Sequence, residues 1–168
     1  MTNQNLIQRV VGETLIAAKF RRVKNMYYKS GTLAVVAVHL LRSRFGPLYH
    51  LDLYANFLAI DSNPYPGQAA HLQLRADRLL ELYGCSRGEL SGVFSLGDPM
   101  SDSQREADIR RVMGNLVVAI DDFLSVTDLR DPISRRFVDL ALARGSAQDY
   151  LASNHVPWRE STLHNNVE

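Results

Sequence analysis

Apolar and polar residues alternate most regularly between residues 34 and 57. A period of two is typical of β-strands that have one buried face. The alternation is interrupted at Gly46 and Pro47, which are turn-forming residues. We therefore expect two strands joined as a hairpin, with the second strand running from about Leu48 to Ile60.

Two more strands are expected beside this hairpin. Aromatic and β-branched residues lie on both sides of Ser30 and Gly31, which predicts a preceding strand joined through a tight two-residue turn. Residues 61–68 are rich in turn-forming residues, and the alternation over residues 71–76 then predicts a fourth strand. Residues 75–83 are equally compatible with a helix.

Helical periodicity appears before these strands and is absent from the segment that directly follows them. At the N-terminus, apolar residues recur at steps of three and four up to Ala18, which predicts an amphipathic helix with a cap at Asn3 or Asn5. Residues 83–99 contain four glycines and show no such period. We expect a loop around a short extended piece in this segment.

The C-terminal half predicts a group of helices. One apolar face continues from Ile109 to Leu124, and Ser101 can cap the helix that carries it. Asp131, followed by proline, can cap a second helix that Gly145 would end. Ser146 can begin a short third helix.

Together these elements predict an α+β fold. The expected architecture is an antiparallel sheet of about four to five strands, with an N-terminal helix and a C-terminal helical group packed on its apolar face. A chain of 168 residues is long enough for one such core. We expect a single domain over residues 1–155 and a loose C-terminal tail over residues 156–168.

The hydrophobic pattern also assigns the two faces of the sheet. If residues 43–46 form the hairpin loop, His39 lies opposite His50, and the apolar positions of both strands share one face. The other face collects one histidine from the earlier strand and polar side chains from every second position of the later strand. One arginine from the fourth strand joins them. These candidate binding residues, the polar row, are His39, His50, Asp52, Tyr54, Asn56 and Arg75.

The polar row has several interpretations. Antiparallel sheets commonly expose one face to water, so a solvated surface that can contact a partner protein is the simplest. A small-ligand or metal site is an alternative, because His39, His50 and Asp52 supply groups that hold iron or zinc or transfer protons. The chain has no recognisable catalytic motif, so we expect no catalytic residue, no metal ion and no cofactor.

Charge argues against some classes of partner. The formal net charge is +1, with 22% charged and 46% hydrophobic residues, so no strong field attracts nucleic acid or an anionic membrane. Short basic clusters leave one alternative open. This is a nucleic-acid-associated module that uses Arg21, Arg22, Arg42 and Arg44.

The expected location is the cytoplasm. The chain has one cysteine, Cys85, so no disulfide can form within it. The first residues lack the continuous apolar stretch of a signal peptide, and no run approaches the roughly 20 apolar residues of a membrane span.

Several phrases occur in an order that is familiar from one family. They are an aromatic residue with two basic ones, a tyrosine, a long aromatic strand and a pair of arginines, here Phe20-Arg21-Arg22, Tyr28, Arg42-Ser43, Tyr49 to Phe57, and Arg75 with Arg78. Over roughly residues 5–150 the chain resembles the bacterial family catalogued as domain of unknown function 4304. Leu41 or Arg42 stands where that family often has glutamine, and Phe57 replaces its usual glycine. The resemblance implies an α+β domain without an established activity.

The function expected from these observations is non-enzymatic binding. We expect a bacterial cytoplasmic protein that contacts a partner protein through its sheet face or loops, as immunity proteins do when they neutralise a toxin. The near-neutral charge is unusual for inhibitors of nucleases, which tend to be acidic.

Overall fold

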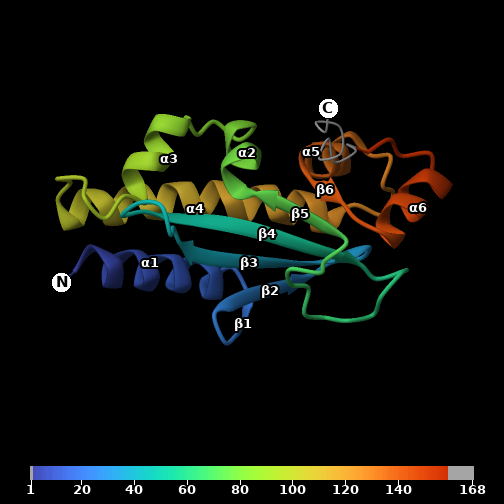
Figure 1. The fold of residues 1–168 in the computed structure, drawn as a ribbon, viewed down its shortest axis with the longest axis horizontal. Helices are drawn as coiled ribbons and strands as arrows, with labels where there is room; N and C mark the ends of the chain where they lie inside the picture. Colours follow the sequence, from blue (N-terminus) through green and yellow to red (C-terminus); the bar gives the residue numbers. More distant parts are fainter. Residues whose placement is uncertain (1, 159–168) are drawn as a thin grey trace, which may run out of the picture.

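The computed structural model describes residues 2–158 and contains one open antiparallel sheet of six strands (Figure 1). Each strand is hydrogen-bonded to the next one in sequence, in the order β1-β2-β3-β4-β5-β6. The strands are β1 (Arg21–Val23), β2 (Met26–Ser30), β3 (Ala34–Arg42), β4 (Tyr49–Phe57), β5 (Leu72–Arg75) and β6 (Leu142–Ala143). The α+β prediction is confirmed, but the sheet has six strands, not four to five. The two additional strands, β1 and β6, are edge strands of three and two residues, too short to show a period.

Residues 2–158 also form six helices, which share one apolar core with the sheet. They are α1 (Asn3–Ala17), α2 (Ala76–Glu81), α3 (Arg87–Val93), α4 (Asp102–Ser125), α5 (Pro132–Leu140) and α6 (Ser146–Ser153). The long helices α1 and α4 pack against each other, and α2 and α3 stand beside one half of α4, while α5 and α6 lie at the other end (Figure 1). The N-terminal helix and the C-terminal helical group therefore occur as predicted.

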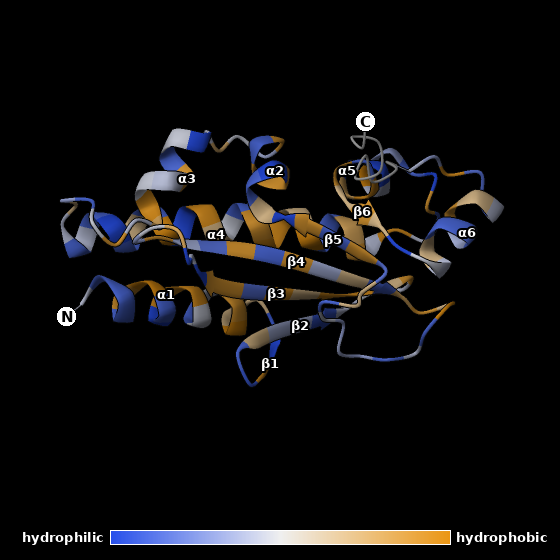
Figure 2. Cartoon of the chain, viewed as in Figure 1, coloured by the Kyte–Doolittle hydropathy of each residue, from blue (hydrophilic) through white to orange (hydrophobic). Residues whose placement is uncertain are grey.

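One continuous apolar core joins the helices to a single face of the sheet. Val36, Val38 and Leu53 are fully buried in it, and the apolar stripes of α1 and α4 supply the opposing side chains (Figure 2). A second, small cluster of Ala37, Tyr54 and Ala70 lies on the other face. The assignment of the apolar face is correct, because strand side chains alternate strictly between faces.

The register within each hairpin differs from the prediction. His39 lies opposite Asp52, and His50 lies opposite Leu41. The β3–β4 loop is two residues longer than expected, because Ser43 N–H donates to Leu48 O over 2.9 Å. A shift of two positions keeps every side chain on its predicted face, so the hydrophobic pattern does not distinguish the two registers. The β2–β3 turn also lies further along the chain than predicted, between Ser30 and Ala34, and Ser30 lies opposite Val35.

The segment predicted as a loop contains a helix. Ser86 caps α3 by accepting a hydrogen bond from Glu89 N–H, while the Glu89 side chain accepts one from Ser86 N–H. This capping box offsets the low helix propensity of Gly88 and Gly92. The loop prediction for residues 83–99 is therefore wrong for Arg87–Val93.

The other helix ends are partly as expected. Ser101 and Asp131 cap α4 and α5 as predicted, but Thr2, not Asn3 or Asn5, caps α1. Helix α5 ends at Leu140, and Gly145, with a φ of 49°, precedes α6 instead of ending α5.

The packed part of the chain extends a little beyond the predicted domain boundary at residue 155. Val156 is buried in the core, and Trp158 packs against it. The rest of the predicted tail, residues 159–168, lies outside the described residues.

Candidate functional site

Four side chains of the sheet's polar face lie in one line across the strands. Met26 pairs with His39, His39 with Asp52, and Asp52 with Arg75. Asp52 is the centre of this line, with a side chain that is only 14% exposed. Tyr54 O–H donates to its Oδ2 over 3.4 Å. Its Oδ1 is 3.6 Å from Arg75 Nε and is buried without a hydrogen bond among residues 2–158.

The two histidines of the row stand on different sides of Asp52. His50 Nε2 is 4.0 Å from Asp52 Oδ1, whereas His39 Nε2 is 2.8 Å from Asn25 Nδ2. An amide nitrogen only donates, so this contact suits a neutral His39 ring whose Nε2 accepts the hydrogen bond. Partial burial lowers the pKa of both histidines, and the nearby Asp52 carboxylate opposes this shift only in part.

The far end of the polar row is covered by the chain itself. Asn56 is buried, and its Oδ1 accepts a hydrogen bond from His71 N–H over 3.2 Å. His71 Nδ1 in turn accepts from Phe57 N–H over 2.9 Å. Burial raises the pKa of Tyr54, which is 1% exposed, and the Asp52 carboxylate adds to this rise. Tyr54 and Asn56 are thus parts of the folded structure and are closed to a partner.

The loop between β4 and β5 forms this cover. It passes beside β2 (Figure 1), where the Tyr65 ring packs edge-on against Tyr28 with centroids 5.1 Å apart. Residue Ala70, near its end, packs on Tyr54 and Ala37. Only the near end of the polar row, at His39, His50, Asp52 and Arg75, therefore faces open space.

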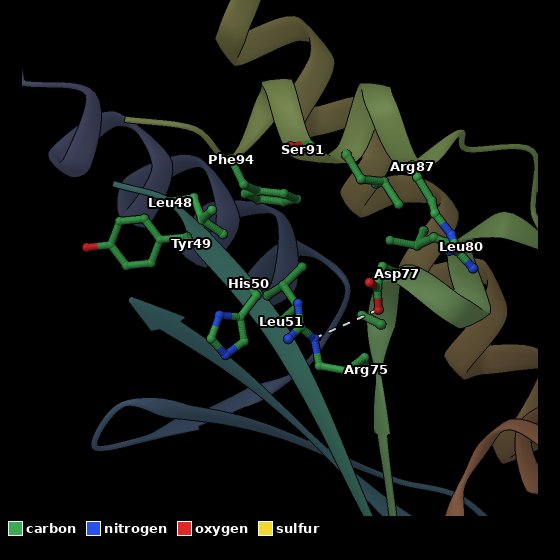
Figure 3. A pocket seen from close by; sticks show the side chains of 12 residues that line it. Leu48, Tyr49, His50, Leu51, Arg75, Asp77, Leu80, Arg87, Ser91 and Phe94 are labelled. Carbon is green, nitrogen blue, oxygen red and sulfur yellow. Dashed lines mark ion pairs between the residues drawn. The ribbon is translucent and has the colours of Figure 1, made fainter. Parts of the chain in front are cut away.

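A pocket of about 220 Å³ opens beside this near end. It arises because β5 pairs with β4 only from Asp52 onward and then turns into α2. The end of α3 takes the place of β5 further along β4, where Tyr49 N–H donates to Phe94 O over 2.9 Å. The space between α2, α3 and β4 is left unfilled (Figure 3).

The pocket has an apolar floor and a charged rim. Leucines and one phenylalanine form the floor, which consists of Leu48, Leu51, Leu80, Leu90 and Phe94. The rim consists of His50, Arg75, Asp77, Arg87 and Ser91 (Figure 3). Two residues of the polar row, His50 and Arg75, are therefore also rim residues.

The charged residues of the rim form ion pairs within the chain. Arg75 is shared between Asp52, at 3.6 Å, and Asp77, at 3.8 Å. Arg87 forms an ion pair with Glu81. Asp77 is the carboxylate among the residues that line the pocket, and Arg75 and Asp77 remain 51% and 42% exposed. Groups this accessible are free to reorganise around a partner.

A fully buried arginine fixes the wall that α3 gives to the pocket. The Arg105 guanidinium donates to four backbone oxygens, those of Gly92, Val93, Ser95 and Asp98, over 2.7–3.3 Å. These carbonyls lie at the end of α3 and in the turn after it, where helix carbonyls have no partner within the helix. Arg105 therefore holds Leu90 and Phe94 against the sheet.

Sequence reasoning missed most of the pocket. Ser86 followed by Glu89 is a capping-box signal that could have identified α3, and with it Arg87 and Ser91. No sequence signal indicates that α3 returns to the edge of β4. Arg105 lies one turn before Ile109 on the buried face of α4, so the recognised helical period places it on the apolar side, but its charge gave no reason to expect burial.

The four arginines of the nucleic-acid alternative occupy two separate places. Arg21 and Arg22 lie on edge strand β1, and Arg22 stacks over the Tyr27 ring at 5.6 Å. Arg42 and Arg44 lie at the tip of the β3–β4 hairpin. Sheet geometry separates the two pairs by two strands and at least four residues, roughly 15 Å or more.

Two further classes of site are not formed by the described chain. Among residues 2–158, no three His, Cys, Asp or Glu side chains are grouped so that they could hold a metal ion. Within the same range, no helix combines the length and the apolar character needed to cross a membrane.

The fold and the site define an α+β protein with an open antiparallel sheet and a charged-rim pocket at one end of its polar face. Comparison of the chain with family models, with curated proteins and with solved structures finds no match in any of the three. The resemblance to the domain of unknown function 4304 stays a prediction.

Proposed function

We propose that the protein binds a partner protein at the pocket between α2, α3 and β4. The observation that supports this is an apolar pocket ringed by accessible charged groups. Protein interfaces concentrate their binding energy in this arrangement, because an anchor side chain is desolvated in the centre while polar groups around it exclude water.

The size of the pocket favours a side chain over a larger ligand. Pockets for drug-sized molecules usually measure about 300–1,000 Å³. A volume of about 220 Å³ suits one large apolar side chain. The anchor would contact Leu48, Leu90 and Phe94, and polar groups beside it would meet the rim.

His50, Arg75 and Asp77 would give the interface its specificity. Arg75 already bridges two carboxylates at distances beyond good hydrogen bonds, 3.6 and 3.8 Å, so either carboxylate can take a donor from the partner. Neutralisation of a toxin, as by an immunity protein, is the particular form of this function that we propose.

The test is co-expression of the protein with each product of the genes that flank its own, followed by co-purification and titration calorimetry. Ser91→Trp places an indole in the pocket, and Ser153→Trp on α6, at the other end of the molecule, is the matched control. We expect a complex that the control retains and that Ser91→Trp weakens by at least about 30-fold. A complex that Ser91→Trp leaves unchanged, or no complex with either product, would contradict the proposal.

A further inference from the structure

Phe45, at the tip of the β3–β4 hairpin, is fully exposed. An aromatic side chain offers about 150–250 Å² of surface that is favourable to bury, so complete exposure is costly in water. The backbone at this position is hydrogen-bonded within the tip, since Phe45 N–H donates to Ser43 Oγ over 3.1 Å. The hairpin therefore presents the ring outward from its tip.

The same chain carries a pocket that suits this ring. The floor is apolar and includes Phe94, which can pack against a second aromatic ring. The volume of about 220 Å³ is that of one large side chain, as argued above. Phe45 does not fill its own pocket, because its side chain is fully exposed.

Tip and pocket lie close together on the surface. Leu48, which lines the pocket, follows Phe45 by three residues, so the two are separated by at most roughly 10 Å of chain. Two copies related by a two-fold axis near the hairpin could thus exchange tips, each inserting Phe45 into the other's pocket. Such reciprocal contacts are the usual form of a symmetric dimer interface.

Charge at the two surfaces is complementary. Arg42 and Arg44 flank the ring, are exposed, and take part in none of the ion pairs formed within residues 2–158. The rim arginines already have partners in their own chain, because Arg75 lies beside Asp52 and Asp77 and Arg87 pairs with Glu81. Asp77 is the carboxylate among the residues that line the pocket, and it is accessible and only weakly held by Arg75. An arginine from the second copy can pair with it.

We infer that the pocket accepts Phe45 of a second copy of this chain, so that two copies form a symmetric dimer through exchanged hairpin tips. This inference rests on the proposed function, because it uses the same pocket and names one of its occupants. Binding of a different partner then competes with self-association.

The experiment measures the mass of the purified full-length protein by sedimentation velocity over a wide range of concentrations. Phe45→Glu removes the anchor, Ser91→Trp blocks the pocket, and Val118→Glu changes an equally apolar, half-exposed residue on α4 as the control. We expect a dimer for the wild type and the control. Each of the two test variants should weaken dimerisation by at least about 30-fold.

Mixing the two test variants gives a result that a merely damaged protein would not. The Phe45→Glu chain has an intact pocket and the Ser91→Trp chain has an intact tip, so the mixture can form one of the two contacts. We expect a heterodimer to appear in the mixture although neither variant dimerises alone. A monomeric wild type, or a dimer that survives Phe45→Glu, would overturn the inference.

The outcome also separates this inference from the proposed function. If Phe45→Glu leaves the oligomeric state unchanged while Ser91→Trp still abolishes capture of a flanking gene product, the pocket binds a partner other than a second copy. If the Phe45→Glu variant is monomeric and binds that product at least as well as the wild type, both statements hold.

Discussion

At the scale of single residues, Arg105 holds the backbone that follows α3 beside the pocket. Its guanidinium is completely buried and serves four carbonyl oxygens that no other described side chain satisfies. Its Nε is buried without a partner within residues 2–158, so the environment is strongly desolvated. A charged group in such a place is stable only because the carbonyls replace its water.

Arg105→Met is therefore expected to destabilise the protein by about 3 kcal/mol or more, because a side chain of similar length leaves the buried carbonyls of Val93 and Ser95 without a donor and removes one donor each from Gly92 and Asp98. The measurement is urea unfolding followed by circular dichroism. Arg130→Ala, which removes an exposed arginine paired only with Asp128, is the control and should show no resolvable change. Equal stability of the Met variant and the wild type would rule out the structural role assigned to Arg105.

At the scale of elements, the end of α4 determines the turn between β2 and β3. Thr32 N–H donates to Leu124 O over 3.3 Å, so the turn backbone lies directly on the last turn of the helix. A Cβ added at Gly31 would be 2.2 Å from the same oxygen. Glycine is required at this position because the backbones approach closely, whereas the sequence suggested only a tight hairpin.

Gly31→Ala is expected to lower the free energy of unfolding by about 1–3 kcal/mol, since helix and turn must separate to admit the methyl group. Gly114→Ala, in the middle of α4, is the opposite case. A Cβ there meets nothing within 4 Å, so alanine should stabilise the helix by about 0.5–1 kcal/mol. Chemical denaturation measures the free energy of unfolding of both variants. A change of the same sign in both would contradict the contact at Leu124.

At the scale of the whole molecule, three histidines share an environment that favours their neutral form. Burial lowers the pKa of His39, His50 and His71 below the ordinary value of 6.5. His71 has a specific reason to stay neutral, since its Nδ1 accepts the Phe57 N–H and a protonated ring cannot accept. The unfolded chain therefore binds protons more readily than the folded protein as the pH falls.

We accordingly expect full histidine-linked stability above pH 6.5 and a progressive loss as the pH falls from about 6.5 through the lower folded-state pKa values. Unfolding by urea at several values between about pH 7.5 and 5.5 measures this slope. His71→Asn offers an amide oxygen in place of Nδ1 and does not titrate, so its stability should depend less on pH. A slope identical to the wild type would mean that His71 does not contribute.

Much of the fold could be predicted because its elements are long and strongly periodic. Helix α4 and strands β3 and β4 show many repeats of their pattern, whereas β1 and β6 have three and two residues. Helix α3 was missed because its glycines suggested a loop, although the Ser86 capping box outweighs them.

The candidate site was predicted less well. Asn56 and Tyr54 share a face with Asp52, yet a loop that follows β4 buries them.

The sequence by itself determined which side chains share each face of the sheet, because a period of two fixes the face of every strand residue. It could not determine the register, since His39 has the same face opposite Asp52 as opposite His50. Tertiary contacts made that choice, as Pro47 and Tyr49 pair with the backbone after α3 and Gly31 rests on α4. The pocket likewise exists only in the folded chain, because its floor and rim come from three separate segments within residues 48–94 that no local pattern connects.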